Sequence, residues 1–259
     1  MSRQARVTLL GTGTSHGVPM IGCDCAVCLS TDPRDRRWRP SAYIQLPDLA
    51  VLVDTSTDLR AQALRFGVSH VDAILFTHGH ADHVMGLDEV RRFNALQGGR
   101  IACYADAQTV GEVRRTFAYI FEAGAPRGGG LPELDLFTVA GEFSLGRQVV
   151  VPITVLHGRR PVLAYRIGSF AYVTDCSSIP DSSWPLLEGV EWLVLDALRE
   201  RPHPTHFSVT QALEVVRRIA PRRAWFTHIA HDLSHAETCA RLPEGVELAY
   251  DGLTLDVAV

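Results

Sequence analysis

The chain carries, at residues 77–83, the stretch Thr77-His78-Gly79-His80-Ala81-Asp82-His83. Four side chains that can bind a metal fall within six positions, directly after the apolar run 73–76. Imidazole and carboxylate together suit zinc, manganese or iron, and they do not suit calcium or magnesium alone. These side chains cannot all share one helix face or one strand face, so we predict a loop that wraps around a metal. The alternative, a polar surface loop after a buried strand, is disfavoured by the density of histidines.

Composition indicates a folded protein with a sizeable core. The 259 residues are 46% hydrophobic and 21% charged, which fits one large domain or two small ones. A net charge of −4 without a long basic block argues against binding of a long nucleic acid, whereas a small anionic substrate needs only a local basic patch. The sequence shows neither a membrane span nor a signal peptide, and we expect a cytoplasmic protein with no membrane partner.

Strand and helix patterns follow each other in two successive halves. Predicted strands cover 7–10, 41–46, 50–53, 72–76, 101–104, 136–139, 149–156, 163–167, 171–174, 192–195, 224–227 and 253–257. Predicted helices cover 57–66, 86–96, 107–120, 208–219, which Ser208 would cap, and 234–242. Two such halves predict two packed sheets with helices outside. The glycine-rich segment 122–130 does not divide two domains, and we interpret it as a mobile loop, for which a place over the site is one option.

Three of the six cysteines are crowded at Cys23, Cys25 and Cys28. This C-x-C-x-x-C spacing in a reducing compartment indicates a metal site rather than a disulfide. Three thiols can converge on one tetrahedral zinc, but a closed structural site needs a fourth ligand from elsewhere in the chain. Three buried free cysteines are the alternative.

Two further features flank the cysteines. The glycine-rich turn 11–19 lacks the lysine and the spacing of a nucleotide-binding loop, so it either needs only the backbone freedom of glycine or also lines a site. Four arginines follow the cysteines, and such a run is usually a solvated face, although one or two of these guanidinium groups could reach a phosphate. They are Arg34, Arg36, Arg37 and Arg39.

Three single polar residues repeat one pattern farther along the chain. His157, Asp175 and His228 each follow a predicted apolar strand at its carboxyl end. Each alone is weak evidence, because a polar residue at a strand end is commonly a cap or a turn. Together they match the way active sites are built on layered α/β folds. With the four side chains of 77–83 they are too many for one metal and suit two.

With these seven residues the chain resembles the metallo-β-lactamase superfamily, because they follow the order of that superfamily's metal ligands over nearly the whole length of the chain. The resemblance implies an α/β fold, a four-layer αββα sandwich, with a two-metal site at one edge of the paired sheets. It also implies two divalent metal ions, zinc or manganese, with the following ligands: His78, His80 and His157 for one metal, Asp82, His83 and His228 for the other, and Asp175 as a bridge. The bridge and the lack of a secretion signal disfavour a true β-lactamase.

A narrower resemblance joins the chain to the PhnP-type phosphodiesterases, which open phosphoribosyl 1,2-cyclic phosphate. It rests on the motifs at 11–19, 22–28 and 37–40. In that family three cysteines and one distant histidine hold a structural zinc, which implies His231 as the fourth ligand here. The alternative for His231 is a solvent-exposed histidine at a helix start. We expect a single domain over 1–259 with a zinc knuckle at 22–40, in which the structural zinc braces His228.

Phosphodiesterases of this superfamily also carry a histidine that contacts the scissile phosphate, and His206 matches it in Thr205-His206-Phe207-Ser208. Asp196 ends the preceding strand and could orient that imidazole, while His203 competes for the role from three residues away. The predicted catalytic residues are therefore His206, Asp196 and Asp82. Hydroxide formed at the two metals would attack phosphorus, and His206 would stabilise the charge and protonate the leaving sugar oxygen.

These observations predict a dinuclear metal-dependent phosphodiesterase that hydrolyses a small cyclic ribose phosphate or a nucleotide-type diester. A tRNA-processing nuclease would need a basic arm, which is not evident, and a glyoxalase II-type thioesterase should lack the cysteines and His206. A non-hydrolytic relative such as PqqB shares the cysteines, but the intact ligand set here counts against it. A small phosphodiester is the expected partner, and the resemblance implies a homodimer. No recognition role transfers to His16 or Trp38.

Overall fold

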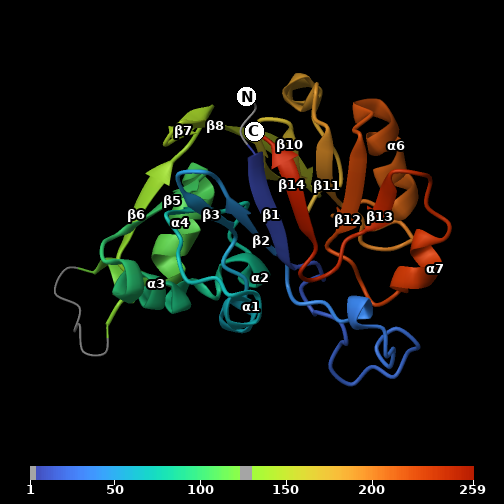
Figure 1. The fold of residues 1–259 in the computed structure, drawn as a ribbon, viewed down its shortest axis with the longest axis horizontal. Helices are drawn as coiled ribbons and strands as arrows, with labels where there is room; N and C mark the ends of the chain where they lie inside the picture. Colours follow the sequence, from blue (N-terminus) through green and yellow to red (C-terminus); the bar gives the residue numbers. More distant parts are fainter. Residues whose placement is uncertain (1–3, 123–129) are drawn as a thin grey trace.

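The computed structural model describes residues 4–122 and 130–259, and its strands form two seven-stranded sheets (Figure 1). The first sheet has the order β14-β1-β2-β3-β4-β5-β6, and the second has the order β13-β12-β11-β10-β9-β8-β7. The two packed sheets expected from the sequence are therefore present. The predicted loop at 122–130 falls almost entirely outside the described residues.

The first sheet combines strands from both ends of the chain. β1 pairs antiparallel with β14 and with β2, and β2 pairs antiparallel with β3, whereas β3 to β6 run parallel. The run of buried residues in β3 and β4 is what a parallel strand covered on both faces requires. Its strands are β1 (Gln4–Gly11), β2 (Ser41–Gln45), β3 (Ala50–Val53), β4 (Ala73–Leu75), β5 (Ile101–Ala105), β6 (Leu134–Thr138) and β14 (Thr254–Ala258).

The second sheet follows the same plan. Strands β7 to β10 pair antiparallel, and strands β10 to β13 run parallel. Sequence patterns missed β7 and β13, because each has only three residues with a polar one in the middle, whereas the equally short β4 belongs to the apolar run 73–76. The strands are β7 (Phe143–Leu145), β8 (Gln148–His157), β9 (Arg160–Ile167), β10 (Phe170–Val173), β11 (Trp192–Asp196), β12 (Arg223–Thr227) and β13 (Val246–Leu248).

Helices cover the outer face of each sheet. The first sheet carries α1 (Leu59–Phe66), α3 (Val90–Gln97), α4 (Ala107–Thr116) and α5 (Ala118–Phe121). The second carries η3 (Asp181–Leu187), α6 (Val209–Ile219) and α7 (His235–Cys239). Between the sheets, one core packs side chains of both inner faces, among them Val7, Val51, Tyr172 and Trp225. The four-layer αββα sandwich is confirmed, and a single domain over 1–259 stays a prediction.

The structure corrects two local predictions. The segment 77–83 is a loop only as far as His80, because α2 (Ala81–Val84) begins there, with the amides of His83 and Val84 bonded to the carbonyl oxygen of His80 at 3.0 and 3.2 Å. The helices predicted at 86–96 and 107–120 are each divided. The first begins as a 3-10 turn, η2 (Leu87–Glu89), and the second breaks at Phe117, whose φ and ψ of −114° and 42° are not helical.

The predicted cap of α6 is confirmed. The hydroxyl of Ser208 accepts from the Gln211 amide, and the Gln211 side chain accepts from the Ser208 amide in return. A further 3-10 turn, η1 (Pro33–Asp35), follows the cysteines. Among the helices of the described residues, none combines the length and the apolar character that crossing a membrane would require.

Candidate metal centre

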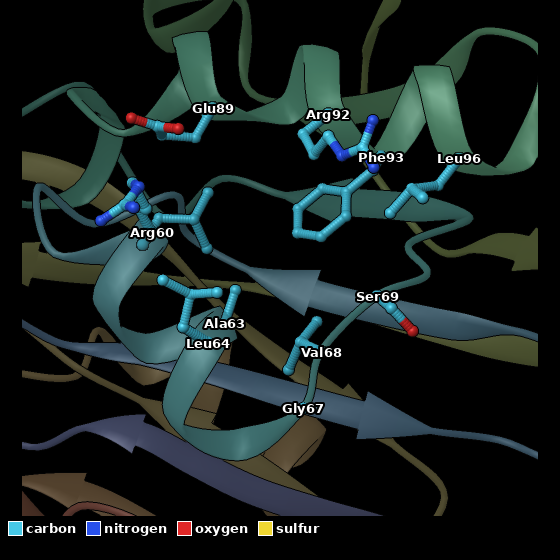
Figure 2. A pocket seen from close by; sticks show the side chains of 11 residues that line it. Arg60, Ala63, Leu64, Gly67, Val68, Ser69, Glu89, Arg92, Phe93 and Leu96 are labelled. Atoms are coloured by element: carbon cyan, nitrogen blue, oxygen red, sulfur yellow. The ribbon is translucent and has the colours of Figure 1, made fainter.

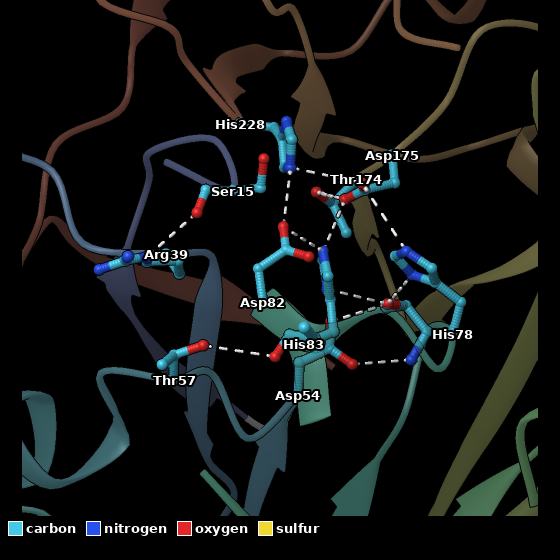
Figure 3. Close-up of polar contacts among 12 residues, drawn as sticks. Ser15, Arg39, Asp54, Thr57, His78, Asp82, His83, Thr174, Asp175 and His228 are labelled. Atoms are coloured by element: carbon cyan, nitrogen blue, oxygen red, sulfur yellow. Dashed lines mark hydrogen bonds and ion pairs between the residues drawn. The ribbon is translucent and has the colours of Figure 1, made fainter. Parts of the chain in front are cut away.

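The metal-capable side chains gather where strands of both sheets end (Figure 3). Asp54, Asp175 and His228 each lie one or two residues beyond β3, β10 and β12, with φ values of 60°, 54° and 61°. Residues other than glycine rarely adopt this left-handed backbone, and such strain concentrates at functional sites. The tight turn after each strand brings its polar side chain to the shared edge, which is the arrangement expected from the sequence.

One candidate ligand group is His78, His80 and His157, and each of them offers one ring nitrogen that lies within 4.8 Å of those of the other two. The ring centroid of His80 is 4.4 Å from that of His78 and 5.2 Å from that of His157. Nδ1 of His157 lies 2.8 Å from the carbonyl oxygen of Thr205, so it donates there and leaves Nε2 free to bind a metal.

The second group is Asp82, His83, Asp175 and His228. Asp175 lies at its centre, because its Oδ2 is 3.1 Å from Nε2 of His83 and its Oδ1 is 3.3 Å from Nε2 of His228. Oδ1 of Asp175 is also 3.9 Å from Nε2 of His78 in the first group. One carboxylate thus lies near both groups, and its role as a bridge between two metals stays a prediction.

The residues fit divalent metal ions. Nε2 atoms of His78, His83 and His228 are buried and make no hydrogen bond to a described group. A buried polar nitrogen without a partner costs roughly 1–3 kcal/mol, and two metal ions, one in each ligand group, would satisfy all three. Burial alone would lower the pKa of His83, but the carboxylates led by Asp175 raise that pKa well above its ordinary value. The carboxylates therefore attract positive charge to this point.

Asp54 is a site residue that sequence reasoning missed. Its fully buried carboxylate accepts from the Thr77 amide at 2.8 Å, from the Thr77 hydroxyl at 2.7 Å and from Nδ1 of His83 at 2.7 Å. A proton on Nδ1 leaves Nε2 of His83 bare and facing Asp175. Asp54 therefore positions a candidate ligand. The available signal was its place directly after an apolar strand, the same signal that identified Asp175.

His206 lies between the two groups. Its ring centroid is 4.6 Å from that of His157 and 4.5 Å from that of His228. Its Nδ1 lies 2.7 Å from Oδ2 of the fully buried Asp196, so the carboxylate fixes the ring, as the sequence suggested. The competitor His203 is less buried, and its Nδ1 is used locally to accept from the hydroxyl of Thr205 at 3.1 Å.

The cysteine motif closes around His231. Nδ1 of His231 lies 3.2, 3.4 and 3.7 Å from the sulfur atoms of Cys23, Cys25 and Cys28. A tetrahedral zinc with ordinary bond lengths would separate sulfur from nitrogen by about 3.6 Å, so the four residues fit that ion. The backbone amide of Cys28 lowers the pKa of the Cys25 thiol to about 7, which favours the thiolate that binds metal.

The structure decides two alternatives that the sequence left open, one for the glycine-rich turn 11–19 and one for the arginine run after the cysteines. The glycine-rich turn lines the site, because residues 14–17 border the hollow that also contains His206. The Thr14 amide also donates to the carbonyl oxygen of Ile229 at 3.1 Å, one residue from His228. The arginine run is not uniformly a solvated face, because Arg37 is only 2% exposed and donates to the Thr12 hydroxyl at 3.1 Å.

Two hollows differ in their relation to this centre. An apolar hollow of about 360 Å³ between α1 and α3 is lined by side chains such as Leu64, Phe93 and Leu96, and it contains none of the predicted ligands (Figure 2). A hollow of about 250 Å³ is lined by His16, His203 and His206. The second hollow is therefore the one that opens beside the candidate catalytic histidine.

Two solved structures are similar to this chain in fold. A crystal structure described as a new diphosphatase from the PhnP family is 44% identical, with a TM-score of 0.93 over 99% of this chain and 98% of that chain. Zinc-bound PqqB from Methylobacterium extorquens, at 20% identity, shares the fold with a TM-score of 0.76 over 97% of this chain and 100% of that chain.

An octanoyltransferase of Porphyromonas gingivalis is 36% identical over 96% of this chain. The match covers 51% of that protein, so this chain spans about half the length of that relative. Residues 50–229 match the family model described as beta-lactamase superfamily domain, a range that includes all seven candidate active-site ligands. With its αββα sandwich, this chain belongs to the metallo-β-lactamase superfamily.

Proposed function

We propose that this member of the metallo-β-lactamase hydrolases is a phosphodiesterase acting on a small cyclic ribose phosphate or a nucleotide-type diester. The observation that carries the proposal is the place of His206, between the two candidate ligand groups and fixed by Asp196 at 2.7 Å. A histidine held there can contact a phosphoryl group that spans both groups.

The candidate ligands would hold two divalent ions, zinc or manganese, which would neutralise phosphoryl oxygens and supply a nucleophile from water. Asp196 accepts the Nδ1 proton of His206, so Nε2 is the atom that faces the site. From Nε2 the imidazolium would donate to the departing oxygen, and the buried carboxylate would stabilise its charge.

A structural zinc on Cys23, Cys25, Cys28 and His231 is the second part of the proposal. His231 lies three residues after His228, in the turn that leaves β12. A zinc bound there would limit the movement of that turn. We therefore propose that the knuckle holds a catalytic ligand in place and takes no part in the chemistry.

A diphosphatase is the second candidate, because the relative that is 44% identical bears that description. Cleavage of a diphosphate is also an in-line displacement at phosphorus, so the same residues would serve it. Octanoyl transfer is named for a protein of which this chain matches only about half, and no described residue favours that reaction here. A cytoplasmic location, a homodimer and the absence of long nucleic acid partners stay predictions.

The test is turnover by metal-replete enzyme. The substrates are bis-p-nitrophenyl phosphate, cyclic nucleotides, phosphoribosyl 1,2-cyclic phosphate, a dinucleoside diphosphate and a glutathione thioester. Diester hydrolysis is expected. Preference for the diphosphate would select the second candidate, and thioester hydrolysis without diester hydrolysis would refute both.

Paired variants test the assignment of His206. We expect His206→Ala to lower kcat about 100-fold or more, the usual contribution of a positioned acid, and His203→Ala to change it less than about tenfold. Equal losses in the two variants would remove the special role of His206.

A further inference from the structure

One ion pair joins the segments that carry the first ligand group, which is His78, His80 and His157. It links Glu112 of helix α4 to Arg160, the first residue of strand β9, with Nη2 of Arg160 2.5 Å from Oε2 of Glu112. The arginine side chain is 22% exposed, the least of the arginines that form a described ion pair. Salt and solvent screen such a pair less than a surface pair. The chemistry proposed at the metals leaves both side chains without a role.

The carboxylate of Glu112 packs against the backbone between two of the ligands. A Cβ atom at Gly79, the residue between His78 and His80, would lie 2.1 Å from Oε2 of Glu112 and 3.0 Å from its Cβ. The backbone of Gly79 has no positive φ, so glycine is needed here for space and not for its conformation. Glu112 therefore lies directly against the loop that carries the first two ligands.

The ion pair connects this loop to the hairpin of the third ligand. Both oxygen atoms of Glu112 are engaged, because Oε1 accepts from Nε2 of Gln108 at 3.1 Å and Oε2 accepts from Arg160. Arg160 is the register partner of His157 at the turn end of the β8–β9 ladder. Only two residues separate them in the chain, so a shift of one moves the other. The ion pair thus fixes the ligand loop relative to the hairpin.

His80 is the ligand of this group with the least support for its side chain. Nδ1 of His157 donates to the carbonyl oxygen of Thr205 at 2.8 Å, and Nδ1 of His78 lies 3.1 Å from the hydroxyl of Thr77. The imidazole of His80 is partly exposed and forms no hydrogen bond with a described group, although histidines that bind metals normally have such a partner. Its position therefore depends on the backbone, which the ion pair supports before it and helix α2 supports after it.

We propose that Glu112 and Arg160 form a clamp that positions His80 for metal binding. Because the clamp ties the ligand loop to the hairpin of His157, it raises the affinity of the first ligand group for its metal ion. The inference rests on the proposed function, since it takes that group as one of two metal sites. The two sites then depend on different residues. Asp54 supports the second group, and no described contact joins either clamp residue to that group.

The test is calorimetric titration with Mn²⁺ of protein whose active-site metals have been removed by dialysis against a chelator. Imidazole and carboxylate groups bind Mn²⁺, whereas thiolates bind it poorly, so the cysteine site does not contribute. Wild-type protein is expected to show two binding events. Glu112→Ala and Arg160→Gln should each weaken one event about tenfold and leave the other within about twofold, a loss at the lower end for partners of metal ligands.

A clamp makes three further demands that a general loss of packing would not meet. The double variant Glu112→Ala with Arg160→Gln should lose no more affinity than either single variant, because either change alone breaks the pair. Arg160→Lys keeps the charge, and the pair has a single described contact, so lysine should recover most of the affinity. Adding Asp54→Asn to Arg160→Gln should weaken both binding events, because Asp54 acts on the other group.

Arg100→Gln is the matched control. It breaks an ion pair with Asp135 of β6 at 2.8 Å, which lies outside the metal centre, and it should leave both binding events unchanged. Urea denaturation shows whether each variant is folded. Glu112 is a partly exposed residue of a helix, where alanine is well tolerated, so Glu112→Ala should fold even if Arg160→Gln does not.

Each outcome separates the clamp from the proposed function. Additive losses in the double variant, equal weakening of both events in a single variant, or a loss in Arg160→Lys as large as in Arg160→Gln would overturn the clamp. Wild-type Mn²⁺ binding in both single variants, with diester hydrolysis intact, would overturn it and leave the phosphodiesterase standing. No hydrolysis of any diester, with one binding event still weakened in the variants, would refute the proposed function and keep the clamp.

Discussion

Replacing Asp54 tests whether a buried carboxylate sets the chemistry of a metal ligand. Its two oxygen atoms accept from three donors on Thr77 and His83, at 2.7–2.8 Å. Asp54→Ala would leave all three donors buried and unpaired, at roughly 1–3 kcal/mol each, enough to unfold many proteins. Asp54→Asn keeps the shape and is the informative change.

In Asp54→Asn an NH₂ group takes the place of one oxygen atom. With its oxygen on the Thr77 amide, that NH₂ group faces Nδ1 of His83 and the Thr77 hydroxyl. The hydroxyl can rotate to accept, but Nδ1 can accept only if its proton moves to Nε2, the atom that faces Asp175. We expect metal affinity to fall about 10- to 100-fold, or about 1.4–2.7 kcal/mol, as for other partners of metal-binding histidines.

The assay is metal titration of the apoprotein against a competing chelator, with metal content per chain measured in parallel. Asp72→Asn is the matched control. Asp72 also accepts from a backbone amide, that of Ala50 at 2.7 Å, and from a histidine, His70 at 2.8 Å, but it is partly exposed and outside the site. Affinity of Asp54→Asn within about twofold of wild type, well below the loss expected for such a partner, would refute the tautomer argument.

Three further changes probe other parts of the structure. Cys25→Ser should release one zinc per chain and lower stability, and unchanged metal content would contradict the structural zinc. Gly86→Ala would place a Cβ 2.1 Å from the Ser56 carbonyl oxygen, so urea denaturation should show a loss of about 1–3 kcal/mol, and wild-type stability would show that the turn can yield. Burial, with Arg37 nearby, lowers the pKa of His235 to about 4. The unfolded chain therefore gains a proton first, and stability should fall as pH drops from about 6.5 to 4. In His235→Gln this slope should be smaller, by about 1–2 kcal/mol across the window, and an equal slope would contradict the assignment.

The sequence was sufficient to predict the layered fold and to predict that the candidate ligands lie at one edge of the sheets. A strand that ends in a ligand-type residue is a local pattern, and His157, Asp175 and His228 each display it. The cap of α6 was equally local, since Ser208 and Gln211 lie within one turn.

Features that depend on distant partners escaped prediction. Nothing local distinguishes Arg37 from the neighbouring arginines. Its burial depends on contacts with Thr12 and with Ala249, and Ala249 is 212 positions away in the chain. Asp54 acts on His83 across 29 positions. The polar hollow bounded by the 16–19 turn, the segment 36–39 and helix α1 likewise joins separate segments, and only the fold brings their side chains together.

The pairing of β1 with β14 has a mechanical consequence. Gln4 lies opposite Ala258 in an antiparallel ladder, so both strands reach the outside of the molecule at the same end of that ladder. Tension applied through the two ends of the chain would separate these strands one hydrogen bond at a time, beginning at Gln4 and Ala258, instead of loading the whole ladder at once. A protein pulled in this way should open at low force by losing β14 first, while the ligand-bearing edge of the second sheet is still folded.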